Sequence, residues 1–267
     1  AFTVYHATIA ISPSIAAANS SVTFSGTGWP ADENILVDLG LGNPYGNLIC
    51  SVRSDAGGAF TQSCTMSPYF AQGTYTVSAS DFSIIATGNQ VTITPVIYIS
   101  PAYANPTNRV QATGFTFAAN SNLTVKLGSV AVTPSVTSTD ANGRVDFFFN
   151  VPSGTAAGAT TITVTDSATP PNSASIAFTV YNATISVSPS TVSRGGSVTV
   201  SGSGWPPLGG GAYVYIGPVL ICGVYEDATG TIPATACTVP SSAPTGTFDV
   251  VATDGAITTT GNPVTVN

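Results

Sequence analysis

The sequence predicts an all-β protein made of three antiparallel β-sandwiches in tandem. One reason is a repeat, because residues 1–14, AFTVYHATIAISPS, match residues 177–190, AFTVYNATISVSPS, at eleven of fourteen positions. A second is the composition, in which β-branched residues are abundant and Lys, Glu, Gln and Leu are scarce, so that no segment sustains a helical period. The third is the alternation of apolar and polar residues in many short stretches, which is typical of strands with one buried face.

Each predicted unit begins with the same opening motif. The three copies are IAISPS at residues 9–14, IYISPA at 97–102 and ISVSPS at 185–190. Their spacing divides the chain into units of 85 to 88 residues, the size of an immunoglobulin-like sandwich. We therefore expect domains at residues 7–94, 95–182 and 183–267, with residues 1–6 left over as a separate N-terminal strand.

The strand that follows the opening motif is repeated as well. SSVTFSGTGWPA at residues 20–31 matches GSVTVSGSGWPP at 196–207, and RVQATGFTFAA at 109–119 is a diverged middle copy. Later strands are predicted at TYTVSAS, TITVTDS and TFDVVATD, which begin at residues 74, 161 and 247. These patterns predict about seven short strands in each unit.

A hairpin recurs in all three units as SDAGG, TDANG and EDATG. Each copy has an Asp that can accept hydrogen bonds from turn amides and a Gly that permits a positive φ angle. Asp140, Asn142 and Asp146 resemble part of a calcium loop, but the other copies lack the later carboxylate, so a turn is the better interpretation. With these motifs the whole chain resembles the immunoglobulin-like repeats of archaeal and bacterial cell-surface proteins, which implies the same fold for each unit.

The four cysteines follow the repeat. Cys50 and Cys64 lie in the first predicted unit and Cys222 and Cys237 in the third, and the leading Cys of each pair stands five residues before the hairpin Asp. A four-cysteine zinc site needs close CxxC pairs, which the sequence lacks. We therefore predict two disulfides, each within one unit and each contributing roughly 3 kcal/mol to stability. Disulfides indicate an oxidising compartment outside the cytoplasm.

Charge and hydropathy exclude several partners. Asp, Glu, Lys and Arg make up 6% of the residues, and the net charge is −7 with only five Lys and Arg. Without a basic patch, the chain is expected to bind neither nucleic acid nor an anionic membrane surface. The longest apolar run, residues 212–225, is too short to span a bilayer and is interrupted by Gly217 and Pro218. Ala1 suits the residue left after removal of a secretory leader, which favours an extracellular location at the cell surface.

The sequence offers no catalytic constellation. Its one histidine, His6, lies in a predicted linker where the repeat has Asn182. The Gly-x-Gly stretches before Trp29 and Trp205 fall in predicted strands without a following helix, which disfavours phosphate binding. We therefore predict no enzyme, no cofactor and no metal site. The two tryptophans are expected to shield the ends of their sandwiches, with a sugar-stacking platform as the alternative.

Residues 1–6 are the most informative segment. The AFTV of residues 177–180 must be the last strand of the second unit, because it stands directly before the next opening motif. The same letters at residues 1–4 precede an opening motif too, and no unit stands before them in this sequence. We predict that Phe2, Thr3, Val4 and Tyr5 add as a strand to the sheet of another molecule, with Phe2 and Val4 filling its pockets. A longer alternating array is the other interpretation.

The linkers between units span only two to four residues. Such short junctions restrict bending, so the units are expected to form a rod on the order of 100 Å long. Asn19, Asn122 and Asn182 stand in sequons within predicted loops or linkers, which makes them candidate sites for covalent glycans.

A stiff rod with an adhesive terminal strand suits a polymer. We expect a structural subunit of an extracellular filament that joins copies of itself head to tail, and in composition the chain resembles the thread-like or pilus-like surface filaments of archaea. A stalk or surface-layer segment of a longer repeat protein, or a carbohydrate-binding or adhesin module, are the alternatives.

Overall fold

The computed structural model describes residues 3–40 and 47–267, and this part of the chain folds into strands, turns and loops without any helix. The predicted all-β fold of antiparallel, immunoglobulin-like sandwiches is confirmed. The antiparallel ladders are accompanied by short parallel pairs, such as Ile15 to Ala17 against Thr92 to Thr94. These parallel pairs join the opening segment of a unit to its last strand.

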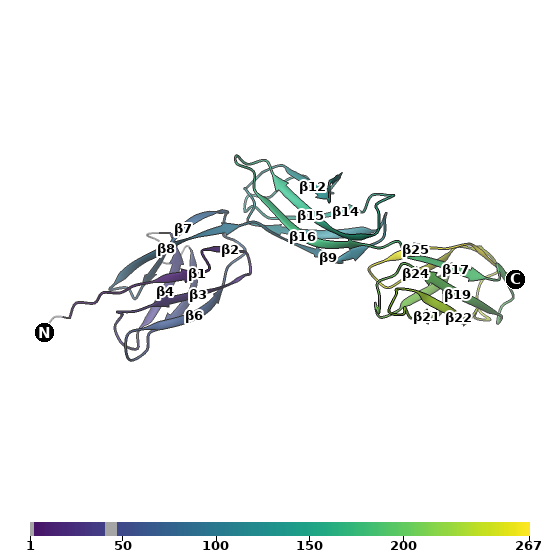
Figure 1. Ribbon diagram of the computed structural model, residues 1–267, viewed down its shortest axis with the longest axis horizontal. Coiled ribbons are helices and arrows are strands. Elements are labelled where there is room, and N and C mark those ends of the chain that lie inside the picture. The colour runs from purple at the N-terminus through teal and green to yellow at the C-terminus, as the bar shows by residue number, and fades with distance from the viewer. Residues whose placement is uncertain (1–2, 41–46) are drawn as a thin grey trace.

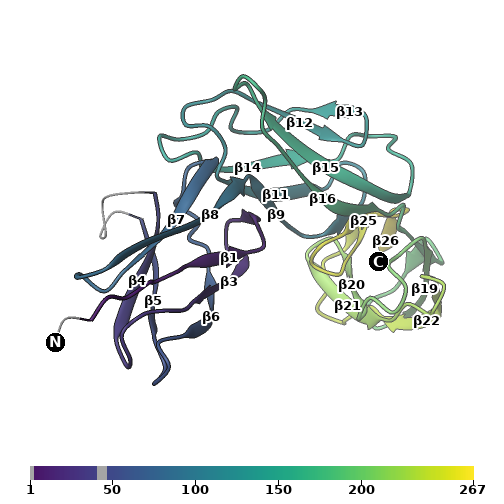
Figure 2. The ribbon, with the colours of Figure 1, turned by 60° about the vertical axis from the view of Figure 1, so that its left-hand side comes forward.

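The buried apolar side chains of the described residues form three hydrophobic clusters. The clusters lie within residues 9–93, 97–180 and 183–266, and we call the strands around them the first, second and third units. The units follow one another along the longest axis of the molecule, with the two termini at opposite ends (Figure 1). The second unit stands to one side of the other two in both views, so the chain is elongated but bent (Figure 2).

The first unit has a three-stranded and a five-stranded sheet. The smaller sheet has the order β1 (Ala10–Ser12), β3 (Ser21–Gly26) and β6 (Phe60–Thr65). The larger sheet has the order β2 (Ile15–Ala17), β8 (Ile85–Thr94), β7 (Gly73–Ser80), β4 (Asn34–Leu39) and β5 (Leu48–Arg53). Alternate residues of β3, such as Val22 and Phe24, are buried, as the apolar–polar alternation predicts.

The second unit repeats this arrangement. Its smaller sheet has the order β14 (Val145–Asn150), β11 (Arg109–Phe115) and β9 (Val96–Ser100). Its larger sheet has the order β10 (Tyr103–Ala104), β16 (Ser173–Val180), β15 (Gly158–Asp166), β12 (Leu123–Leu127) and β13 (Val130–Val132). The two-sheet design is therefore kept even where the sequence motifs have diverged.

The third unit differs in that its larger sheet is divided in two. The three-stranded sheet has the order β17 (Thr184–Ser188), β19 (Ser197–Ser203) and β22 (Ile232–Thr238). A second three-stranded sheet has the order β18 (Thr191–Val192), β26 (Val264–Val266) and β23 (Gly246–Phe248). A four-stranded sheet has the order β21 (Val219–Val224), β20 (Ala212–Ile216), β24 (Val250–Thr253) and β25 (Thr258–Thr260). Pro263 stands between β25 and β26 where β8 has Gln90, and a proline has no N–H to continue a ladder.

Asparagine side chains fasten the opening strand to the opposite sheet in the first and third units. The Asn89 amide accepts a hydrogen bond from the Ile11 N–H at 2.9 Å and donates one to the Ile11 carbonyl at 3.0 Å. Asn262 binds Val187 in the same way, at 2.9 Å for both bonds. Because a carboxamide has the donor and acceptor of a peptide group, each asparagine replaces one rung of a β-ladder.

The two tryptophans are structural. Trp29 and Trp205 are 2% and 1% exposed, and each indole N–H donates at 2.9 Å to a backbone carbonyl of the opening segment, that of Thr8 or of Thr184. The hairpin glycine packs against the same residue, since a Cβ on Gly58 would lie 2.0 Å from the Trp29 carbonyl oxygen. The expectation that the tryptophans shield a sandwich end therefore agrees with their burial. Their faces are covered, which removes the sugar-stacking alternative.

The hairpin carboxylates serve their own turns. Oδ1 of Asp140 accepts hydrogen bonds from the N–H groups of Asn142 and Arg144, both at 2.8 Å. The later carboxylate, Asp146, pairs instead with the Arg144 guanidinium at 2.7 Å. This arrangement supports the turn interpretation over the calcium loop.

Disulfides join Cys50 to Cys64 and Cys222 to Cys237. The first bridge connects β5 to β6 and the second connects β21 to β22, so each ties the sheet that holds the opening strand to a second sheet of the same unit. In the second unit Ser135 takes the place of the leading cysteine. Its backbone N–H donates to the Phe148 carbonyl and its hydroxyl accepts from the Phe148 N–H, both at 2.8 Å, so hydrogen bonds hold this position without a covalent bridge.

Candidate assembly surface

The joint between the second and third units is built around two asparagines. The Asn105 side chain donates to the Ala183 carbonyl at 3.0 Å and accepts from the Ala183 N–H at 2.9 Å. Asn108 binds Thr258 in the same way, at 3.0 and 2.8 Å. We call these two residues the asparagine clamp. Because the side chains imitate peptide groups, the clamp extends the hydrogen bonding of the third unit onto the second.

Two tyrosines complete this joint. Tyr103 and Tyr181 pack edge to face, with ring centroids 5.7 Å apart, and both rest against the third hydrophobic cluster. The Tyr103 hydroxyl donates to Oδ2 of Asp254 at 3.4 Å. Burial, followed by the Asp254 carboxylate that accepts this hydrogen bond, raises the pKa of the Tyr103 phenol above its ordinary value. The joint therefore favours the neutral phenol.

The loop that carries Asp254 is a small capping structure. Oδ1 of Asp254 accepts hydrogen bonds from the N–H groups of Ala256 at 2.8 Å and Ile257 at 2.6 Å, which leaves Oδ2 for Tyr103. Ile257 lies beneath the loop and is fully buried. We call this loop, together with Ala183, the opening end of the third unit.

The first unit carries the same opening end. Its loop is formed by residues 81–85, and Oδ1 of Asp81 accepts from the N–H groups of Ser83 at 2.9 Å and Ile84 at 2.6 Å. Ala7 takes the place of Ala183, and the His6 carbonyl lies against Gly28 as the Asn182 carbonyl lies against Gly204. The capping bonds and this backbone contact are therefore shared with the third unit.

The surroundings of the first unit's opening end are different. Within residues 3–40 and 47–267, neither Oδ2 of Asp81 nor the backbone N–H and carbonyl of Ala7 has a hydrogen-bond partner. Phe82 is 69% exposed and Ile85 is 73% exposed. In the third unit, the corresponding groups bind the second unit. In the first unit, no other unit among the described residues packs on them.

The predicted N-terminal strand adjoins this end. Thr3, Val4 and Tyr5 are exposed and belong to no strand of the single chain, and Phe2 lies outside the described residues. In the second unit, the identical sequence forms part of β16, where Phe178 and Val180 are buried between β15 and β10. Two of the five residues, Phe178 and Val180, are thus core in the second unit, whereas residues 3–5 are solvent-exposed.

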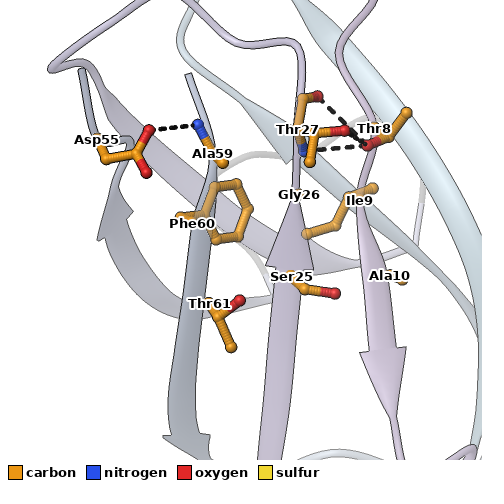
Figure 3. Close-up of a pocket in the computed structure, with 10 residues that line it drawn as sticks. All are labelled: Thr8, Ile9, Ala10, Ser25, Gly26, Thr27, Asp55, Ala59, Phe60 and Thr61. Carbon is orange, nitrogen blue, oxygen red and sulfur yellow. Dashed lines mark hydrogen bonds between the residues drawn. The ribbon is translucent and has the colours of Figure 1, made fainter. Parts of the chain in front are cut away.

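Below the terminal segment, a hollow opens on the sheet of β1, β3 and β6 (Figure 3). Hydroxyl, methyl and aromatic groups line it, with Asp55 as its single carboxylate. Oδ1 of Asp55 accepts from the Ala59 N–H at 2.9 Å, and the Thr8 hydroxyl accepts from the Thr27 N–H at 3.0 Å (Figure 3). These groups serve the hairpin and the opening strand, so the hollow is a packing feature beside the strand edge.

The second unit meets the first through a different joint. The Tyr98 hydroxyl donates to the Ala18 carbonyl at 3.2 Å, and the Thr116 hydroxyl donates to the Thr94 carbonyl at 2.8 Å. Asp166, the counterpart of Asp81, is buried and turned inward. Burial would raise the pKa of its carboxyl, but hydrogen bonds from Ala118, Asn172 and Ala168 together lower that pKa below its ordinary value. The opening-end device is thus specific to the first and third units.

The remaining predicted residues lie at the surface. The sequon residues Asn19, Asn122 and Asn182 and the single histidine, His6, are all exposed. Over the described ranges, no group of three His, Cys, Asp or Glu side chains is arranged to hold a metal ion. No helix in that same part of the chain has the length and apolar character to cross a membrane.

The asparagine clamp has no counterpart in the repeated motifs. Asn105 and Asn108 follow the opening motif of the second unit, but the first and third units have Ala17 and Ser193 at the place of Asn105. The clamp therefore cannot be predicted from the repeat. Its one indication in the sequence is that Asn105 departs from the repeat close to a linker.

No family model matches this chain, and no curated protein matches it. Among solved structures, it is similar to the tandem repeats in the extending region of a large adhesion protein, with 14% identity over 98% of this chain and 74% of that one and a TM-score of 0.29. A bacterial ice-binding adhesin shares 17% identity over 99% and 98% of the two chains, with a TM-score of 0.24. A Bacteroides ovatus SGBP-B bound to a mixed-linkage heptasaccharide shares 17% identity over 97% and 70%, with a TM-score of 0.27.

Proposed function

We propose that this chain is a structural subunit of an extracellular filament at the cell surface, and that it carries out no reaction. Copies join head to tail when the N-terminal segment of one adds as a β-strand to a sheet of the next. Residues 7–94, 95–182 and 183–267 act as three immunoglobulin-like domains that set the spacing of the joints. The exposed sequon residues Asn19, Asn122 and Asn182 are the proposed attachment sites for glycans.

One observation carries this proposal. AFTVY occurs at residues 1–5 and again at residues 177–181, where its first four residues end β16 with Phe178 and Val180 buried, and an opening end follows directly. Thr3, Val4 and Tyr5 have the same sequence context but no sheet in the single chain. A segment with alternate large apolar residues can gain both ladder hydrogen bonds and pocket contacts from a neighbouring sheet.

Two disulfides and a scarcity of charge support the extracellular location. Disulfides persist in oxidising compartments, and both cysteine pairs of this chain are bridged. A stalk or surface-layer segment of a longer repeat protein is the alternative, in which a preceding unit of the same chain would hold residues 1–5. Intact mass measurement of the secreted protein separates the two, because only the alternative requires a chain longer than this one.

The proposal is tested by altering the terminal strand and examining the protein by negative-stain electron microscopy and light scattering. The double variant Phe2→Asp, Val4→Asp should form no fibres, because Phe178 and Val180 at the matching positions are buried. Thr3→Ser is the matched control, since Thr179 is only half-buried, and it should assemble like the unchanged chain. Fibres of normal length and number from the double variant would refute the role of the strand.

A further inference from the structure

We infer that the opening end of the first unit docks onto the far end of the third unit of a second copy, with the Asp81 carboxylate facing Arg194. The far end is the tip of the third unit around residues 191–196, beside the last strand. This inference rests on the proposed head-to-tail assembly and adds to it a surface, a partner and a charge pair.

The joint between the second and third units supplies the template. There, the opening end offers the Ala183 backbone and Oδ2 of Asp254, and the second unit answers with Asn105 and Tyr103. Ala7 and Oδ2 of Asp81 are the corresponding groups of the first unit, and no partner for them lies in residues 3–40 and 47–267. A unit shaped like the second one, docked against this end of the first, would meet the same hydrogen-bonding groups.

The exposed apolar residues of this end also support a docking surface. Phe82 and Ile85, in the loop of Asp81, are exposed, and so is Tyr5, two residues before Ala7. Phe82 has φ 74°, a region that an aromatic residue rarely adopts, whereas Gly255 holds the matching position in the third unit at φ 92°. An exposed aromatic in such a conformation, beside a second exposed apolar residue, is typical of a contact surface.

The third unit can provide the matching surface. In its parallel pair of strands, Thr191 lies opposite Thr265 and Val192 lies opposite Val266. The second unit has the same register, with Tyr103 opposite Thr179 and Ala104 opposite Val180. The far ends of the second and third units therefore share one backbone platform. Every further copy of this chain has this backbone arrangement at the far end of its third unit, so a second copy is the partner that we infer.

Charge complementarity selects this pairing. Arg194 follows Ser193, the counterpart of Asn105, and its backbone N–H donates to the Asn267 carbonyl at 3.2 Å, which places it beside the end of the last strand. Arg194 is exposed and makes no ion pair with any described residue. It is one of only five Lys and Arg in the chain. In a protein of net charge −7, the Arg194 cation at one end and the Asp81 carboxylate at the other favour head-to-tail over head-to-head contact.

The test is charge reversal, with assembly followed by light scattering and electron microscopy. Asp81→Arg and Arg194→Asp should each slow or weaken association by about tenfold or more, because each places like charges together. The double variant should recover to within about threefold of the unchanged chain. Asp249→Arg, at an exposed position away from both ends, is the control for added charge.

A second pair of variants guards against damage to the loop, because Oδ1 of Asp81 caps the Ser83 and Ile84 amides. Asp81→Asn keeps this acceptor and Arg194→Gln keeps the bulk of the side chain. Both should remove most of the salt dependence of association while the melting temperature stays unchanged. Fibres that require residues 1–5 but assemble equally well in all charge variants would overturn this inference alone. A chain that remains monomeric, or whose fibres ignore residues 1–5, would overturn the proposed function with it.

Discussion

The opening ends of the first and third units have the same capping hydrogen bonds but lie in different surroundings. Asp81 and Asp254 cap their loops with the same pair of hydrogen bonds, to the second and third residues that follow. In the third unit this end is covered by Tyr103 and the asparagine clamp, whereas in the first unit it is exposed. The chain therefore contains one opening end that is covered by a neighbouring unit and a matching opening end that is exposed.

The largest test of this difference is a pair of core truncations. Ile257 is fully buried and its counterpart Ile84 is only partly buried. Ile257→Ala should lower the free energy of unfolding by about 2–5 kcal/mol, and Ile84→Ala by about 1–2 kcal/mol, because less apolar surface is lost from a half-covered site. Chemical denaturation of the single chain measures both. Equal losses would show that the two ends are equally covered.

The second test removes the asparagine clamp. Asn105→Ala leaves the buried N–H and carbonyl of Ala183 unpaired, which should cost about 1–3 kcal/mol, and Asn108→Ala should cost less because Thr258 is exposed. Hydrogen exchange at the Ala183 amide should accelerate by about tenfold or more in Asn105→Ala. Asn142→Ala, at an exposed turn position, is the matched control. Unchanged protection of Ala183 would mean that the clamp does not hold the joint.

The smallest effect concerns alkaline pH. The pKa of Tyr103 is raised in the folded chain, so its neutral form stabilises the joint below the ordinary phenol pKa of 10.0, and this stabilisation is lost as the pH rises through the folded value. Ionised Tyr103 would also repel the Asp254 carboxylate. Unfolding measured from about pH 9 to about pH 12 should therefore show a downward slope that is shallower in Tyr103→Phe. Identical slopes for the two proteins would exclude this titration from the joint.

Local features of the fold were predictable from sequence. The alternation of apolar and polar residues predicted the strands, and the repeated Asp and Gly predicted the hairpins. The spacing of the cysteines predicted disulfides within units, and the structure has them between Cys50 and Cys64 and between Cys222 and Cys237. These features depend on residues close in the chain or on the repeat itself. The domain boundaries and the role of residues 1–6 in assembly stay predictions.

Other features could not be predicted. Pro263 divides the last strand of the third unit, although the surrounding letters match an unbroken strand in the first unit. The clamp residues Asn105 and Asn108 bind groups 78 and 150 positions away, and nothing in the local pattern indicates those partners. Contacts of this kind depend on how two folded units meet.

The sequence by itself determined the units, because strand alternation, turn residues and cysteine spacing act over short distances or recur with the repeat. Only the tertiary structure decided which copy of the opening end is covered. Asp81 and Asp254 have the same local bonds, and they differ because, among the described residues, another unit packs only against the loop of Asp254. Burial is a property of the surfaces brought together, so loops with the same local hydrogen bonds have unequal exposure when only one of them has a neighbour.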